Sequence, residues 1–308
     1  MSFNQSKKYL IVILGPTAVG KTVLAIDIAK EFDTEIISAD SRQFFREMNI
    51  GTAKPNNEEL KSVKHHFINS ISVHDEYNAG IFEREALKTL ETIYQKNGIA
   101  VMTGGSGLYI NAVCNGFDEL PHADKEIRAK IIEMYKLEGI EYLRDTLKKL
   151  DEEHYKKIDI KNPHRLIRAI EVCMVTGMKY SEMRVRDKGQ GAKERKFAVI
   201  KIGLEMEREK LYERINLRVD EMMKQGLLDE VKNLFKYKHL NSLQTVGYKE
   251  LFDFMEGKID LNRAVELIKQ NTRNFAKRQM TWFRKDKTIK WFDPREKTKI
   301  IQYVKDEF

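Results

Sequence analysis

The residues best suited to chemistry form one short loop near the N-terminus. They run Gly15-Pro16-Thr17-Ala18-Val19-Gly20-Lys21-Thr22 and match the pattern G-x-x-x-x-G-K-T. In this pattern the glycines let backbone N–H groups turn toward phosphate oxygens, and the lysine adds a full positive charge. The threonine hydroxyl suits Mg²⁺, which prefers oxygen ligands and bridges phosphates. The loop therefore predicts binding of a diphosphate or a longer polyphosphate, with Thr22 as the ligand of a magnesium ion.

The segments on either side of this loop favour a phosphate site over a chance match. The apolar run 9–14 precedes it and the amphipathic stretch 21–32 follows it, as expected for a strand, a loop and a helix in succession. The helix start adds a partial positive charge beside the loop.

A second candidate for chemistry is Asp40, which follows the apolar run 35–39. In an open parallel sheet this strand would deliver Asp40 to the edge that carries the phosphate loop. The run 98–103 leads into Gly104-Gly105-Ser106-Gly107 without an acid, which argues against an ordinary ATPase. The alternative for Asp40 is a cap on a helix that begins at Ser41. Both roles are compatible, and its expected position beside the loop favours catalysis.

A set of motifs in fixed order resembles the bacterial tRNA dimethylallyltransferases. The similarity extends over nearly the whole chain and is far more specific than the phosphate loop alone. Its segments are 15–22, 37–43, 48–55, 65–68, 77–79, 103–109, 162–172, 214–218, 245–250 and 272–283.

The resemblance implies transfer of a dimethylallyl group from dimethylallyl diphosphate to N6 of the adenosine 3′ of the anticodon, position 37. The tRNAs concerned read codons that begin with U. Asp40 would be the catalytic carboxylate that accepts the N6 proton. Thr22 and Arg218 would bind the leaving diphosphate, Thr22 through a magnesium ion. The alternative for Arg218 is a solvated helix charge, in which Arg214 and Arg218 pair with Asp220 or Glu221.

Charge supports the nucleic-acid part of this interpretation. The formal net charge is +8, and eight lysines and arginines between Lys269 and Lys290 face only one acid, Asp286. Such a segment suits a phosphate backbone, although a solvated helix face is the plain alternative. The family's tRNA contacts map onto Asp40, Ser41, Arg42, Gln43, Ser106, Arg128, His164, Arg165, Leu166, Ile167, Arg168, Gln244, Thr245, Val246, Gly247, Tyr248, Lys249, Arg273, Lys277 and Arg278.

Three positions depart from the family pattern. His164 stands where a glutamine is usual, Ser106 where a threonine is usual and Asn69 where an aspartate is common. The first two substitutions keep a hydrogen-bond donor. An anticodon-loop base must be splayed out to expose N6, so the pocket needs two mouths, one for the donor and one for the base.

Composition and pattern define the expected fold. A chain of 308 residues with 42% hydrophobic content can bury a large core, and its two cysteines support no zinc site or disulfide framework. We expect an α/β fold with a P-loop NTPase-like parallel sheet, a helical insertion and C-terminal helices. Residues 1–116 and 197–308 would form the core domain, and 117–196 the tRNA-binding insertion, with a mobile link at 184–193. We expect a cytoplasmic protein without a membrane span or an obligate protein partner.

Two rival enzymes share parts of this pattern. A P-loop small-molecule kinase gives no reason for the basic C-terminal segment. An adenylate isopentenyltransferase would use AMP, ADP or ATP as acceptor, and such enzymes lack much of the insertion and tail present here. A non-enzymatic RNA-binding module leaves the phosphate loop unexplained.

Overall fold

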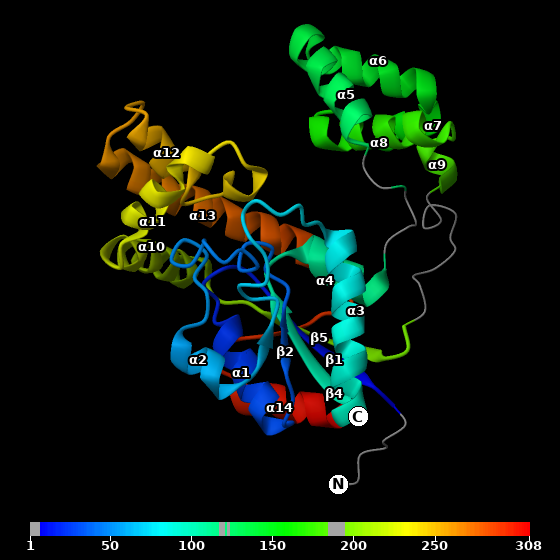
Figure 1. Cartoon of the computed structure of the whole chain (residues 1–308). Helices are drawn as coiled ribbons and strands as arrows, with labels where there is room; N and C mark the ends of the chain where they lie inside the picture. Colours follow the sequence, from blue (N-terminus) through cyan, green and yellow to red (C-terminus); the bar gives the residue numbers. More distant parts are fainter. Residues whose placement is uncertain (1–6, 117–120, 122–123, 184–194) are drawn as a thin grey trace. The chain divides into compact units, whose positions relative to one another are not determined.

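The computed structural model describes residues 7–116, 121, 124–183 and 195–308 (Figure 1). The chain divides into two compact units, which we call the core unit (Met1–Cys114 and Arg195–Phe308) and the helical unit (Asn115–Glu194). Both borders of the helical unit lie two residues before the predicted ones. At the second border, Arg195 already belongs to the core unit. Its Nη2 donates to the Glu83 carboxylate and to the Ala112 carbonyl oxygen, both at 2.7 Å. The link predicted at 184–193 lies outside the described residues.

Six parallel strands form the sheet of the core unit, in the order β3-β2-β4-β1-β5-β6. The strands are β1 (Tyr9–Leu14), β2 (Ile36–Ser38), β3 (His65–His66), β4 (Ile99–Gly104), β5 (Ala198–Leu204) and β6 (Lys290–Phe292). Since all run in one direction, their carboxyl ends meet at the same edge, where ligands bind in open α/β sheets. The predicted α/β fold with a parallel sheet is confirmed.

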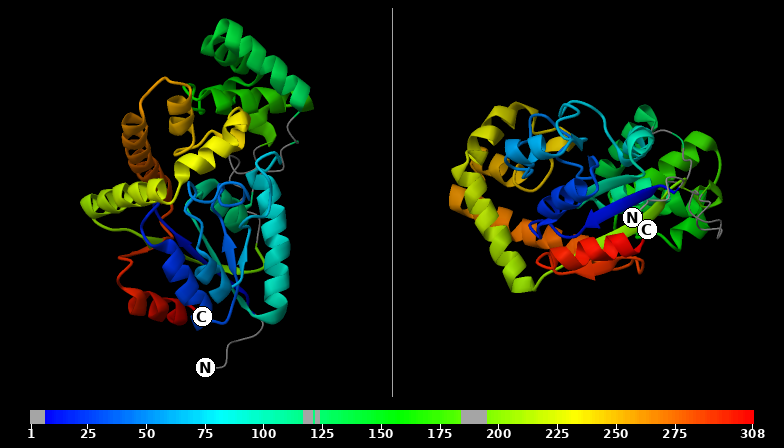
Figure 2. Two further views of the ribbon diagram at one scale, coloured as in Figure 1. Left: turned by 60° about the vertical axis from the view of Figure 1, so that its left-hand side comes forward. Right: turned by 90° about the horizontal axis from the view of Figure 1, so that it is seen from below.

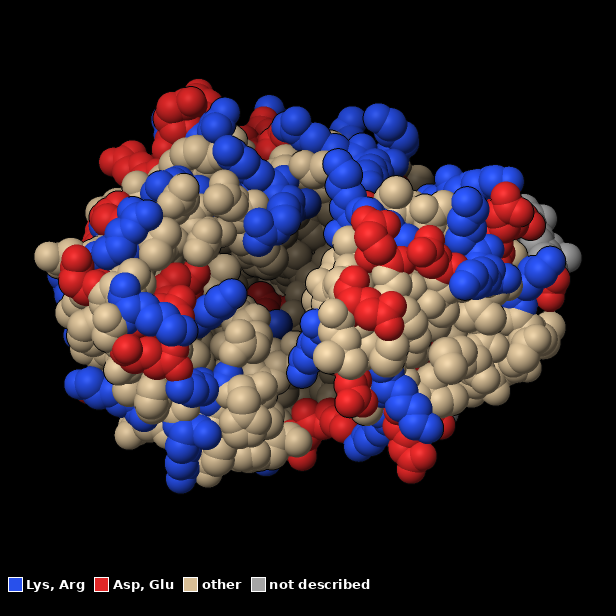
Figure 3. Space-filling view, turned by 90° about the horizontal axis from the view of Figure 1, so that it is seen from above, with Lys and Arg blue, Asp and Glu red and all other residues tan. Residues whose placement is uncertain are grey.

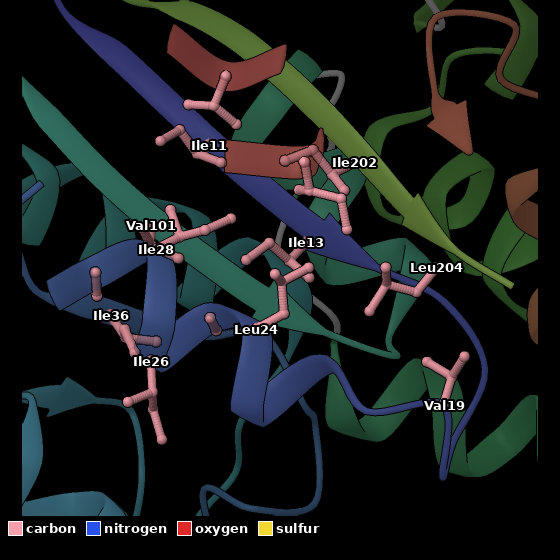
Figure 4. Close-up of a cluster of buried hydrophobic side chains, with 14 of the residues drawn as sticks. Ile11, Ile13, Val19, Leu24, Ile26, Ile28, Ile36, Val101, Ile202 and Leu204 are labelled. Atoms are coloured by element: carbon pink, nitrogen blue, oxygen red, sulfur yellow. The ribbon is translucent and has the colours of Figure 1, made fainter. Parts of the chain in front are cut away.

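Helices cover both faces of the sheet. Strand β1 is therefore buried on both sides, which explains why its apolar run is continuous. Ile11 and Ile13 pack with Leu24 and Ile28 of α1 (Figure 4), whereas Val12 belongs to the cluster on the opposite face. Strands of a parallel sheet are buried on both sides and so need apolar residues at every position. The helices that contribute to these two clusters are α1 (Lys21–Glu31), α3 (Ala79–Lys96), α4 (Gly107–Asn115), α10 (Arg208–Lys224), α13 (Leu261–Phe283) and α14 (Lys297–Asp306).

The helices that form a further apolar cluster lie beyond the carboxyl edge of the sheet (Figure 2). This cluster joins α10 and α13 to α11 (Leu227–Leu234), η2 (Phe235–Tyr237), η3 (Asn241–Leu243) and α12 (Lys249–Met255). Phe45 and Met48, from the loop after β2, pack into the same cluster, and the short helix α2 (Asn57–Ser62) follows that loop. The loop is therefore fixed against helices that come much later in the sequence.

The helical unit has its own apolar core. It contains α5 (Lys125–Glu138), α6 (Ile140–Leu150), α7 (Glu152–Tyr155), α8 (Pro163–Thr176) and α9 (Tyr180–Met183). Residues from α5, α6 and α8 supply its buried cluster, which includes Ile131, Leu143 and Leu166. Within the described residues of this unit the secondary structure is helical, with no strand.

The helix considered as an alternative at Ser41 is not present. Turns and a β-bridge at Phe45 lie within 41–53, before α2. The basic segment 269–290 is not helical to its end, since α13 stops at Phe283 and Lys290 begins β6. The single acid of that segment is bound to the sheet, because Asp286 accepts a hydrogen bond from the Lys201 ammonium of β5 at 2.7 Å. None of the helices in the described residues has the length and apolar character needed to cross a membrane.

Candidate active site

The phosphate loop at 15–22 connects β1 to α1 at the carboxyl edge of the sheet. Gly15 and Gly20 have φ angles of 147° and 110°, a region that favours glycine. A Cβ atom on Gly15 would lie 2.6 Å from the carbonyl oxygen of Leu204, so a larger residue does not fit. No side chain caps the start of α1 at Gly20, which leaves the N–H groups of the first turn facing an anion site.

Lys21 lies across this loop. Its Nζ donates to the carbonyl oxygens of Gly15 at 3.1 Å and Pro16 at 2.7 Å. Burial lowers the pKa of Lys21 to about 8, with the Asp40 carboxylate opposing this shift and Arg218 adding to it. Because both hydrogen-bond partners are neutral, the ammonium still needs a counter-charge, which a bound phosphate would supply.

Asp40 lies two residues after β2, near the end of β4. Its Oδ1 accepts a hydrogen bond from the backbone N–H of Arg42 at 3.0 Å, so the carboxylate is held within its own turn. This segment approaches β4 so closely that a Cβ on Gly104 would lie 2.3 Å from the Ala39 carbonyl oxygen. The Ser41 N–H donates to Ser106 Oγ at 3.0 Å, which ties the Asp40 turn to the loop after β4. The proposed helix cap at Asp40 is therefore wrong.

Arg218 projects from α10 toward the site, not toward solvent. Burial lowers its pKa, Arg214 adds to this shift, and the Asp40 carboxylate opposes it. The alternative pairing with Asp220 does not occur, since Asp220 pairs with Lys269 at 2.8 Å. Arg218 therefore carries a half-buried charge within electrostatic reach of Asp40.

Two cavities meet at these residues. The smaller, of about 450 Å³, is lined by the phosphate loop, and the larger, of about 620 Å³, by α13 and the loops after β4 and η3. Six residues line both cavities: Thr17, Asp40, Thr52, Ala53, Arg218 and Met222. The two cavities therefore adjoin one another at Asp40 and Arg218. Figure 3 shows that lysine and arginine side chains are frequent on the face of the protein seen from above.

One wall of the larger cavity is formed by α13, and most of its side chains were not predicted as site residues from the sequence. Phe275, Gln279 and Trp282 of α13 line it, together with Arg278. Trp282 packs on Gly107, where a Cβ would lie 2.3 Å from the indole ring. Gln279 is only 6% exposed and binds the backbone at Thr17 and Gly105. Its signal in the sequence is its place between Ala276 and Phe283 on the buried face of an otherwise basic helix.

Most of the tRNA contacts predicted in the core unit surround the larger cavity. Its lining includes Asp40, Ser41, Arg42, Ser106, Gln244, Thr245, Val246, Gly247, Lys249 and Arg278. Gln43 instead lines the smaller cavity, where its Nε2 donates to the carbonyl oxygens of Thr52 and Ala53 at 3.3 and 3.2 Å.

Three of the residues predicted to contact tRNA have buried side chains. Leu166 is fully buried and Ile167 is 7% exposed, because both pack in the core of the helical unit. Tyr248 is also fully buried, and its hydroxyl donates to the Glu230 carboxylate at 2.6 Å. These side chains stabilise the fold, so the predicted RNA contacts at these three positions would have to be made mainly by backbone atoms.

Two predicted arginines of the helical unit share an internal acid. Arg168 Nη1 and Arg128 Nη2 lie 2.8 and 3.2 Å from Oε2 of Glu171, which is fully buried. Arg128 keeps 42% of its side chain exposed, so the ion pair leaves part of it accessible. His164 and Arg165, at the start of α8, are exposed.

The three predicted α13 cations differ in their surroundings. Arg273 donates to Asn216 Oδ1 at 2.6 Å and lies over the Tyr212 ring, so it joins α13 to α10. Arg278 lies over the Phe275 ring at the larger cavity, and Lys277 is exposed on another side of the helix.

The residues present fit a magnesium ion that binds together with a diphosphate. Thr22 and Asp40, both with oxygen donors, line the smaller cavity. Within the described residues, no group of three or more His, Cys, Asp and Glu side chains could hold a metal ion alone. A magnesium ion here would therefore depend on phosphate oxygens and water for most of its ligands.

Comparison with known proteins gives a consistent set of relatives. The family model described as IPP transferase matches residues 43–286. The tRNA dimethylallyltransferase of Christiangramia forsetii is 52% identical over 300 residues, which cover 97% of this chain and 98% of that protein. The tRNA dimethylallyltransferase 1 of Bacteroides thetaiotaomicron is 46% identical over 296 residues, covering 96% and 95%.

Solved structures give the same result. The tRNA isopentenylpyrophosphate transferase of Bacillus halodurans is 35% identical and superposes with a TM-score of 0.71, over 98% of this chain and 97% of that one. A eukaryotic dimethylallyltransferase acting on tRNA is 28% identical with a TM-score of 0.75, over 90% of this chain and 70% of that one.

Proposed function

The chain belongs to the IPP transferase family, and from this membership we propose that it acts as a tRNA dimethylallyltransferase. It transfers the dimethylallyl group of dimethylallyl diphosphate to N6 of adenosine 37, in tRNAs that read codons beginning with U. The observation that carries this proposal is the junction of the two cavities, where Asp40 and Arg218 lie between the phosphate loop and the α13 wall. A tRNA substrate also fits the expected cytoplasmic location.

The smaller cavity suits the diphosphate of the donor. The N–H groups at the start of α1, the Lys21 ammonium and the Arg218 guanidinium converge there. These groups favour negative charge, which grows on the leaving oxygen as the allylic C–O bond breaks. Because they are already in place, they stabilise departure of the diphosphate more than they stabilise the bound donor.

The larger cavity suits an extruded adenine. Aromatic side chains on its wall, Phe275 and Trp282, offer surfaces for stacking, and Arg278 offers a cation near the RNA backbone. The N6 amino group would then lie at the cavity junction, next to Asp40. The donor and the acceptor thus reach the same point from opposite sides.

The groups at this junction account for every bond and proton that changes in the reaction. The N6 lone pair attacks the allylic C1 carbon as its bond to oxygen breaks, and the diphosphate leaves with the bonding electrons. The Asp40 carboxylate accepts the proton from N6 and restores a neutral amine. A magnesium ion held by Thr22 and the diphosphate would neutralise charge on the leaving group. Thr17, which lines both cavities, orients the donor.

The helical unit would add RNA contacts through exposed residues such as His164, Arg165 and Arg128.

Two rival functions leave parts of this structure without a role. An adenylate isopentenyltransferase needs no helical unit, and a small-molecule kinase needs no aromatic wall. The relatives named above are all transferases that act on tRNA.

The experiment that tests the proposal offers the enzyme labelled dimethylallyl diphosphate with either unmodified tRNA or AMP. We expect label on tRNA only, at a single adenosine. Replacement of adenosine 37 by guanosine should abolish labelling. Product on AMP instead would identify an adenylate isopentenyltransferase, and release of diphosphate without label on either acceptor would contradict both.

A further inference from the structure

Gln279 occupies an unusual place for a polar side chain. It lies on α13, is 6% exposed, and its amide group bridges two loops that are far apart in sequence. Its Oε1 accepts from the N–H of Thr17 in the phosphate loop at 2.8 Å. Its Nε2 donates to the carbonyl oxygen of Gly105, after β4, at 2.9 Å.

The two partners fix the orientation of this amide. An exchanged oxygen and nitrogen would place Nε2 against a backbone donor and Oε1 against a backbone acceptor. The space is also closed, since a Cβ on Gly105 would lie 2.2 Å from Nε2 of Gln279. A neutral side chain that donates and accepts at once is therefore required at this position.

The bridge connects both halves of the active site. On one side Thr17 belongs to the loop that would hold the diphosphate. On the other side Gly105 precedes Ser106, whose Oγ accepts from the Ser41 N–H beside Asp40 at 3.0 Å. The same helix presents Phe275, Arg278 and Trp282 to the larger cavity. Gln279 thus joins the acceptor wall to the donor loop.

We propose that Gln279 is a positioning residue that couples the two substrates. An RNA loop that orders α13 through Phe275, Arg278 and Trp282 also orders the Thr17 amide through Gln279, and so tightens donor binding. By linkage, the donor tightens RNA binding by the same factor. This inference rests on the proposed function for its choice of RNA and diphosphate as ligands.

The test measures binding of inorganic diphosphate by calorimetry, with and without an anticodon stem-loop RNA. In the wild type we expect the RNA to tighten diphosphate binding by about 5-fold or more, the lower end of common coupling factors. Gln279→Met keeps the length of the side chain and removes both hydrogen bonds. It should weaken diphosphate binding about tenfold and reduce the coupling factor to about 1.

The second variant is Gln279→Glu, which tests the role of the two Gln279 hydrogen bonds even if the methionine variant does not fold. Its carboxyl group can accept from Thr17 at every pH but can donate to Gly105 only when protonated. Diphosphate affinity relative to wild type should therefore recover as the pH falls from 8 to 5. The matched control is Gln270→Glu, on an exposed position of the same helix, which should show no such recovery.

Three results would overturn the proposal: a coupling factor of about 1 already in the wild type, an unchanged factor in Gln279→Met, or a flat relative pH profile in Gln279→Glu. These measurements involve no dimethylallyl transfer. Failure of the wild type to modify tRNA would instead count against the proposed function alone.

Discussion

Asp40 is the only carboxylate among the six residues that line both cavities. Its role as the base follows from that place, since the N6 proton must leave where donor and acceptor meet. Burial lowers the pKa of Lys21 and of Arg218, and the Asp40 carboxylate opposes this shift in both cations. The charged groups that the reaction uses therefore also influence one another in the free enzyme.

Asp40→Asn isolates the proton acceptor from the fold. The new amide oxygen can still accept from the Arg42 N–H, so the turn and the stability should remain. Loss of the base should lower the rate of transfer by about 10²–10⁴, with tRNA affinity within a few-fold of wild type. Single-turnover transfer and filter binding measure the two quantities. Asp33→Asn, in an exposed turn away from the cavities, is the control, and a wild-type rate in Asp40→Asn would remove the assignment.

Arg218→Gln tests the clamp on the leaving group. We expect a higher KM for dimethylallyl diphosphate and a lower kcat, because the guanidinium acts on both the bound and the departing diphosphate. The KM for tRNA should change little. Arg208→Gln, at the exposed start of the same helix, should leave all three constants unchanged. If Arg218→Gln behaves like Arg208→Gln, Arg218 is only a helix charge.

Lys21 predicts a pH dependence of donor binding. Its pKa in the free enzyme is about 8, and a bound diphosphate raises it by adding negative charge. Donor affinity is therefore complete below pH 8 and falls above it, by up to about tenfold per pH unit. Lys21→Arg keeps its charge at these pH values, so its donor KM should not rise between pH 8 and 10. A wild-type donor KM that stays constant between pH 8 and 10 would show that the charge on Lys21 does not contribute to donor binding.

Helix α13 has three roles along its 23 residues. Its first turns pack in the cluster beyond the sheet, its middle lines the larger cavity, and its last turn ends against the sheet. Its basic residues are correspondingly divided. Arg273 holds α10, whereas Lys277 and Arg278 remain on the surface or at the cavity.

This division predicts different effects of removing α13 cations. The double variant Lys277→Ala and Arg278→Ala should weaken tRNA binding and reduce the slope of log affinity against log salt by up to about 0.7 per lost phosphate contact. Arg273→Ala should leave the slope unchanged and lower thermal stability instead. Filter binding across a salt series and thermal unfolding separate the two. An equal loss of slope in both variants would show that Arg273 also contacts RNA.

The sequence predicted the elements with strong local signals and missed those set by tertiary contacts. The phosphate loop, the long strands and the insertion helices carry glycine, apolar-run or amphipathic patterns that tertiary structure does not override. The turns after Asp40 could not be predicted, because Phe45 and Met48 are held by helices nearly 200 residues away. Gln279 was missed for the same reason, since its partners at Thr17 and Gly105 are brought together only by the fold.

At the scale of the whole molecule, the core unit and the helical unit each have a separate apolar core. We therefore expect that one unit can be destabilised while the apolar core of the other stays intact. The helical unit depends in part on Glu171, a fully buried acid that binds Arg128 and Arg168.

Glu171→Ala should destabilise the helical unit by about 1.5–3 kcal/mol, the range for hydrogen bonds to charged groups. Hydrogen exchange should quicken in α5 and α8 and stay unchanged in the sheet. The KM for tRNA should rise while diphosphate binding remains as in wild type. Glu153→Ala, an exposed member of an ion pair in the same unit, is the control. Weakened diphosphate binding in Glu171→Ala would contradict this independence.

The pairing order of the sheet also determines when the protein can complete its fold during synthesis. The central strand β1 needs β5 as a neighbour, with Tyr9 opposite Ala198, so about 190 residues must be made between the two. At 5–20 residues per second the ribosome takes about 10–40 s for this interval. The helical unit, whose contacts are local, emerges whole within it, and local contacts form fast. The nascent chain therefore completes the helical unit while its sheet is unfinished, and β1 keeps one edge without its partner strand until β5 is made.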